Sequence, residues 1–166
     1  MNYFKIFSLS SQYDVDLGEL EKRYIEIQKS TPPDKLANNT AEERFIAFNN
    51  SIDINNAYSQ LKDPLLRAKN LLFLKNINID QEIRKNVTPA ILAKSFSERE
   101  QLEEIIDNKM LRLFLATTKK TITEIVDELS SCFEKNDIKG AITSTINLQY
   151  KTKLLSEIKV KLKKLR

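Results

Sequence analysis

Glycine and proline, the residues that most often interrupt helices, are so scarce in this chain that little besides helix is left for it to form. The 166 residues contain two glycines and four prolines, which leaves few positions for the tight turns of β-hairpins. The prolines stand at three places, Pro32-Pro33, Pro64 and Pro89, and apolar residues recur every three or four positions between them. The sequence therefore predicts an all-α fold whose helices are divided at these prolines.

The first half of the chain predicts two amphipathic helices joined by a short loop. The first begins after Asp16 and ends before Pro32, and the second begins at Thr40 and ends before Asp63-Pro64. Thr40 and Glu43 have the spacing of a capping box, which marks the start of the second helix. A shorter apolar helix follows Pro64, and an apolar cluster at residues 3–9 is expected to pack on the helix pair. We therefore expect residues 1–75 to form one domain around an antiparallel helical hairpin with short flanking helices.

The second half predicts a three-helix bundle. Residues 76–87 are polar and poorly periodic, so we expect a linker there. Thr88-Pro89 has the form of a helix N-cap followed by proline at the first helical position. Three long segments with apolar repeats follow within residues 88–166, and their spacing is typical of a bundle. Cys132 lies on the apolar stripe of the second segment and is expected to be a small core residue.

Composition excludes several kinds of chemistry. One cysteine and no histidine cannot provide the usual ligands of structural zinc or of an iron–sulfur cluster. A Ser-His or Cys-His nucleophile pair is equally excluded. We therefore expect a protein that is not an enzyme and has no cofactor or metal site.

Charge and hydropathy bear on the location of the protein and on whether its partners include nucleic acid or a membrane. The formal net charge is +4, and the basic excess gathers at residues 159–166. We interpret that run as a solvated helix face, because it lacks the aromatic residues with which single-strand binders stack bases; a nucleic-acid binder is the less favoured alternative. No apolar run is long enough to span a bilayer, and the N-terminus does not resemble a secretory signal. We expect a soluble cytoplasmic protein with neither nucleic acid nor a membrane as partner.

Several motifs together resemble the HscB family of J-domain co-chaperones. The sequence opens with Asn2-Tyr3-Phe4 and has Pro33-Asp34-Lys35 in the loop between its first two predicted helices. The most specific stretch covers residues 54–61 (INNAYSQL), 63–68 (DPLLRA) and Leu71-Leu72, and a further match covers residues 99–104 (REQLEE). Together these motifs span nearly the whole chain, whereas a Pro-Asp-Lys tripeptide alone would be weak evidence.

The resemblance implies a fold and a function. It implies an N-terminal J-domain and a C-terminal three-helix bundle that binds the client. Members of this family stimulate ATP hydrolysis by HscA, a DnaK-type chaperone, and deliver the iron–sulfur scaffold protein IscU to it. The chain would thus promote the maturation of iron–sulfur proteins without binding a cluster itself. The alternative is an adaptor that binds the scaffold but does not activate an ATPase.

The resemblance also implies two groups of binding residues. The chaperone would contact a basic helix and the loop after it, at Lys22, Arg23, Lys29, Pro32, Pro33, Asp34 and Lys35. The scaffold would contact a stripe with flanking acids on the first bundle helix and an aromatic ring on the last, at Leu92, Ala93, Phe96, Glu100, Glu104 and Tyr150. For the lysines the alternative is an ordinary solvated face, and for Leu92 and Phe96 it is the core of the bundle. Periodicity does not decide between these alternatives.

Position 32 departs from the family pattern. The family has a histidine before the Pro-Asp pair, and this chain has Pro32. Proline has no backbone N–H and cannot share a proton near neutral pH as histidine can. A matched change in the partner chaperone, a loss of ATPase stimulation, or an introduced substitution at this position would each account for the difference.

Overall fold

The chain folds into helices throughout the part that the computed structural model describes, residues 1–30 and 40–164. The prediction of an all-α fold is confirmed. In order, the helices are α1 (Tyr3–Ile6), α2 (Leu17–Ser30), α3 (Ala41–Lys62), α4 (Pro64–Leu74), α5 (Ile79–Asn86), α6 (Pro89–Glu104), α7 (Asn108–Glu134) and α8 (Ile138–Lys164). They form two compact units, Met1–Leu74 and Lys75–Arg166.

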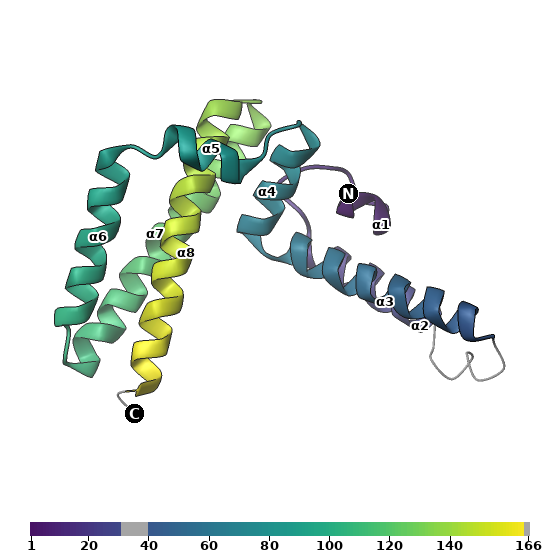
Figure 1. Ribbon diagram of the computed structural model, residues 1–166, viewed down its shortest axis with the longest axis horizontal. Helices are drawn as coiled ribbons and strands as arrows, with labels where there is room; N and C mark the ends of the chain where they lie inside the picture. The colour runs from purple at the N-terminus through teal and green to yellow at the C-terminus, as the bar shows by residue number, and fades with distance from the viewer. Residues whose placement is uncertain (31–39, 165–166) are drawn as a thin grey trace. The chain divides into compact units, whose positions relative to one another are not determined.

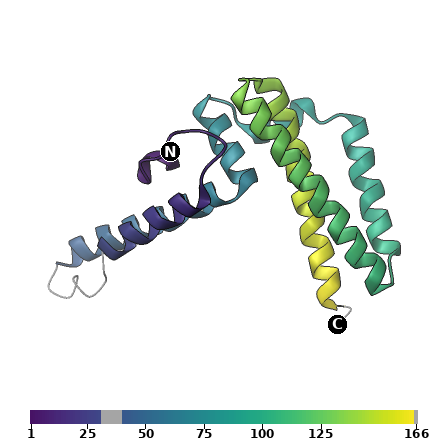
Figure 2. The same cartoon turned by 180° about the vertical axis from the view of Figure 1, so that it is seen from behind.

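The first unit is built on the antiparallel pair of α2 and α3, which lie side by side in both views (Figures 1 and 2). Helices α1 and α4 pack against α3. The expected packing of the N-terminal cluster is confirmed for Phe4 and Phe7, which are buried together with Leu20, Leu61 and Leu72. This apolar core holds the short flanking helices against the long pair.

The ends of α3 and α4 are fixed by the predicted signals. The Thr40 hydroxyl accepts a hydrogen bond from the Glu43 amide, and the Glu43 carboxylate accepts one from the Thr40 amide (3.2 and 2.9 Å). This capping box satisfies two amides that the first turn of α3 leaves free. At the other end the Asp63 carboxylate accepts from the amides of Leu65 and Leu66, so it caps α4 directly behind α3.

The second unit contains the predicted three-helix bundle of α6, α7 and α8, with α7 and α8 lying along each other over most of their length (Figure 1). One apolar cluster of this bundle joins Leu102 of α6 to Leu111 of α7 and to Leu154 and Ile158 of α8. In the turn between α7 and α8, Asn136 adopts the left-handed region (φ 54°).

Residues 76–87 are not the irregular linker that the sequence predicts, because α5 occupies most of that range and packs against α8. Its start is capped by Asn78, whose side chain accepts from the amides of Asp80 and Gln81. Ile79 is the buried apolar residue of this short helix, and Ile83 and Val87 follow it at steps of four residues. This apolar repeat covers only two turns and lies among polar residues, and the prediction of a linker there is wrong.

Candidate functional site

The basic face of α2 separates into two exposed lysines and one engaged arginine. Lys22 and Lys29 are exposed, and neither forms an ion pair or side-chain hydrogen bond with another described residue. They are therefore available to a partner, although their positions alone do not distinguish a docking surface from a solvated face.

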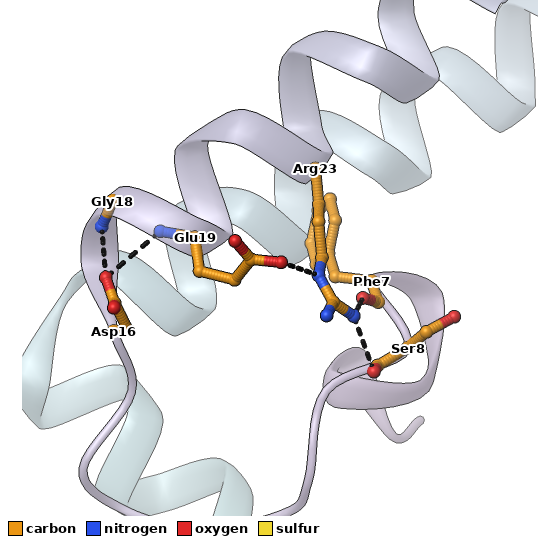
Figure 3. A network of polar contacts seen from close by, with 6 residues as sticks. All are labelled: Phe7, Ser8, Asp16, Gly18, Glu19 and Arg23. Carbon is orange, nitrogen blue, oxygen red and sulfur yellow. Dashed lines mark hydrogen bonds and ion pairs between the residues drawn. The ribbon is translucent and has the colours of Figure 1, made fainter.

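Arg23 instead ties α2 to the end of α1 (Figure 3). Its Nε donates to Glu19 Oε1 at 2.7 Å, and its Nη1 donates to the carbonyl oxygens of Phe7 and Ser8 at 2.7 and 2.6 Å. These carbonyls end the short α1 helix, and Ser8 adopts a positive φ of 52°. The guanidinium thus has a structural partner on each side, which the sequence pattern did not reveal.

The start of α2 is fixed by the same network. Asp16 Oδ1 accepts from the amides of Gly18 and Glu19 at 2.9 and 3.0 Å, which caps the helix and orients Glu19 toward Arg23 (Figure 3). The predicted loop residues Pro32, Pro33, Asp34 and Lys35 lie outside the described residues.

A stacked pair of tyrosines and a set of side-chain hydrogen bonds join α2 to the C-terminal half of α3. The rings of Tyr24 and Tyr58 stack with centroids 4.2 Å apart and planes inclined by 16°. Asn55 Oδ1 accepts from the Tyr24 hydroxyl at 2.8 Å and from Gln28 Nε2 at 3.0 Å. These side-chain hydrogen bonds could not be predicted from the spacing of apolar residues. The contacts fix the two helices that flank the loop.

In the second unit, the contacts of α6 with α8 include two ion pairs and a lysine that binds carbonyl oxygens at the end of α6. Arg99 pairs with Glu157 (Nε to Oε2, 3.1 Å), and Glu98 pairs with Lys151. Lys161 donates to the carbonyl oxygens of Leu102 and Glu103, the latter at 2.9 Å, and so satisfies carbonyls at the end of α6.

Leu92 and Phe96 of α6 are 39% and 63% exposed, so the alternative that they form the bundle core is wrong. Ile106, which the repeat also assigns to the bundle stripe, is 87% exposed. The physical reason is that Ser95 and the two ion pairs occupy the buried face, and only Leu102 is fully buried in the apolar core. An exposed apolar pair of this kind is typical of a binding surface.

The other residues predicted for the scaffold surface are three residues of α6 and one residue of α8. Ala93, Glu100 and Glu104 are exposed. Tyr150 of α8 is half-buried and directly precedes Lys151, whose partner Glu98 lies in the middle of α6. The residues predicted for the scaffold surface thus all belong to the second unit, and the described residues predicted for the chaperone surface belong to the first.

The described residues show little sign of metal or thiol chemistry. No group of three or more carboxylate or thiol side chains is arranged to hold a metal ion in the described ranges. Burial raises the pKa of the half-buried Cys132 thiol, which keeps it protonated. None of the helices between residues 1–30 and 40–164 is both long and apolar enough to cross a bilayer.

Comparisons with known proteins agree with this architecture. Residues 87–159 match a family model described as the HSCB C-terminal oligomerisation domain. A "Co-chaperone protein HscB homolog" from a Shewanella species is 31% identical over 95% of each chain. Among solved structures, the chaperone HscB from Vibrio cholerae superimposes with a TM-score of 0.87 over the full length of both chains at 28% identity. The human co-chaperone HscB superimposes with a TM-score of 0.89 at 25% identity, covering 97% of this chain and 82% of the human one.

Proposed function

The chain belongs to the HscB family of co-chaperones, and from that premise we propose that it delivers an IscU-like iron–sulfur scaffold protein to an HscA-like DnaK-type chaperone and regulates that chaperone's ATPase. In this proposal the second unit binds the scaffold and the first unit docks on the chaperone. The co-chaperone then shifts the chaperone between its states through differential binding and takes no part in the hydrolysis itself.

The observation that best supports scaffold binding is the exposure of Leu92 and Phe96 on α6. Burying both side chains against a partner would remove apolar area from water, and Glu100 and Glu104 would favour a partner with cations around an apolar centre. Ala93 and Ser97 stand where the family commonly has a methionine and a glutamate, so we expect a weaker or altered interface.

The first test is the Phe96→Ala variant, with Phe73→Ala as the matched control. Phe73 is 55% exposed, similar to Phe96, but it lies on α4 in the other unit. We expect Phe96→Ala to weaken binding of an IscU-like scaffold at least about tenfold in calorimetry and to leave stability nearly unchanged. Phe73→Ala is expected to bind as the parent does. Equal losses in both variants would contradict the assignment of the scaffold surface to α6.

For the chaperone we propose a surface of Lys22 and Lys29 on α2 together with the loop residues Pro32, Pro33, Asp34 and Lys35. Exposed lysines favour encounter with an acidic groove and orient the approach. Asp34 follows Pro33 in the loop and is the residue of that loop that we expect to reach the chaperone.

Pro32 favours the second candidate function, a scaffold-binding adaptor that does not activate an ATPase. We expect docking on a standard HscA-like chaperone to survive weakly and stimulation of its ATPase to be strongly reduced, because proline cannot replace the hydrogen bonds and proton exchange of histidine. Single-turnover ATPase assays with the parent and with Pro32→His test this expectation. Equal and strong stimulation by both would overturn it, and the adaptor is favoured if Pro32→His alone restores activity.

A further inference from the structure

One side of α8 carries positive charge with no carboxylate beside it. Glu157 and Lys161 contact α6, so they mark the side of α8 that faces that helix. Lys159 and Lys163 each follow one of these residues by two positions, which places them about 200° further round the helix. They therefore lie on the side of α8 that faces away from α6 and from the proposed scaffold surface.

A groove runs between α7 and α8 on this side. It is lined by Arg112 and Leu115 of α7 and by Lys159, Leu162 and Lys163 of α8. A second hollow continues along α8 past the same two lysines and is lined further by Thr152, Leu155, Ser156 and Val160. No acidic residue lines either hollow.

The cations of this groove are uncompensated. Arg112, Lys159 and Lys163 form no ion pair or side-chain hydrogen bond with any residue that the structure describes. By contrast, the cations on the α6 side of the bundle, Arg99 and Lys151, are each paired with a carboxylate. The cations on the α6 side are thus paired with carboxylates of the same unit, while the cations on the groove side can pair with carboxylates of a partner.

The floor and length of the groove indicate what kind of partner fits. Leu115, Leu155 and Leu162 are half-buried along it, and Val160 is 51% exposed. The second hollow is lined by α8 alone, and from Thr152 to Lys163 that helix rises about 16 Å, roughly three turns of a second helix laid alongside. The half-buried leucines, with Arg112 on α7 and Lys159 and Lys163 on α8, complement a helix with apolar residues on one face and carboxylates at its flanks.

We propose that the α7–α8 groove is a second docking surface, which binds an acidic amphipathic helix of a protein partner. It is distinct from the α6 surface, and it does not depend on the proposed scaffold and chaperone functions. A single-stranded nucleic acid fits less well, because no aromatic side chain lines the groove for base stacking. A bilayer fits less well because the leucines form the floor of a hollow and do not protrude.

The test uses the full-length chain, labelled with nitrogen-15, and a synthetic 18-residue helical peptide with leucines on one face and glutamates on the other. We expect amide shifts centred on Arg112, Leu115 and Leu162. Lys159→Glu should weaken binding about tenfold, because it places a like charge against the peptide. The matched control is Lys139→Glu, which makes the same charge change about 30 Å away on the same helix and should bind as the parent does.

Three further measurements make the proposal falsifiable. A peptide of the same composition with its apolar face scrambled should bind much more weakly; equal binding would show charge attraction alone and overturn the proposal. Shifts centred on α6, or an equal loss in Lys139→Glu, would overturn it as well. Groove-centred binding of a single-stranded oligonucleotide or of anionic vesicles, without binding of the amphipathic peptide, would assign the surface to a different class of partner.

Discussion

Lys22 and Arg23 are neighbouring basic residues of α2 whose surroundings differ. Lys22 extends into solvent, whereas the Arg23 guanidinium holds the Glu19 carboxylate and two carbonyl oxygens at the end of α1. Charge alone would assign both residues to a chaperone-docking face. The contacts show that Arg23 has a role in the internal structure of the unit, besides the docking role predicted for it.

Replacing Arg23 should therefore change stability more than replacing Lys22. We expect Arg23→Ala to lower the free energy of unfolding by about 1–3 kcal/mol, because the Phe7 and Ser8 carbonyls and the Glu19 carboxylate lose a charged donor. Lys22→Ala should stay within about 0.5 kcal/mol of the parent. Urea unfolding of the full chain measures both.

Arg23→Lys adds a stricter comparison, since lysine keeps the charge but not the planar fork of donors. It should recover only part of the lost stability. If Arg23→Ala unfolded as the parent does and lost chaperone binding to the same extent as Lys22→Ala, Arg23 would belong to the docking surface after all.

At the scale of elements, α6 is attached to the bundle differently from α7. Its contacts with α8 are the Arg99–Glu157 and Glu98–Lys151 pairs and the Lys161 bonds to its last carbonyls, with Leu102 as its fully buried apolar anchor. The facing residues of α7 and α8 include Leu111, Leu129, Ile146 and Ile158, all of which are buried. Ion pairs are screened by salt and apolar contacts are not, so the helix with the proposed scaffold surface is the less firmly held one.

This difference predicts a pattern of amide hydrogen exchange. We expect amides of α6 to exchange faster than those of α7, and Arg99→Ala to speed exchange in α6 about tenfold with little change in α7. Lys120→Ala is the matched control, because it removes the exposed pair with Glu124 at 3.9 Å, and such pairs contribute little. Uniform acceleration in α6 and α7 would show that the two helices open together.

The sequence predicts the ends of helices well where a local signal, such as a proline or a capping box, sets them. The Thr40–Glu43 capping box and the breaks at Pro64 and Pro89 each act locally, and all are confirmed. It fails where a face is defined by partners that are distant in sequence. The inward face of α6 consists mostly of polar residues whose partners lie more than 50 positions away, so periodicity could not show that Phe96 points outward. The prediction of a linker at residues 76–87 fails for a different reason, because the Ile79, Ile83 and Val87 repeat of α5 covers only two turns and lies among polar residues.

On the scale of the whole molecule, the hydrophobic core is divided between two units that meet at residues 74 and 75. Phe4, Leu20 and Leu72 belong to one core, and Leu111 and Ile158 belong to the other. We propose that the units are domains with separate roles, the first for the chaperone and the second for the scaffold.

Expression of residues 75–166 alone tests this division. We expect the fragment to be helical by circular dichroism and to bind the scaffold within about threefold of the full chain, because its core and its α6 surface are contained within it. A fragment that is unfolded, or that is folded but binds more than about tenfold more weakly, would contradict the proposed division of roles.

The exposure of Phe96 has a consequence for the solubility of the protein at high abundance. A phenylalanine ring that is 63% exposed is in contact with water until a partner covers it. If Phe96 forms the proposed scaffold surface, each molecule in excess of the scaffold leaves this ring uncovered. We therefore expect overproduction without the scaffold to raise the tendency to aggregate.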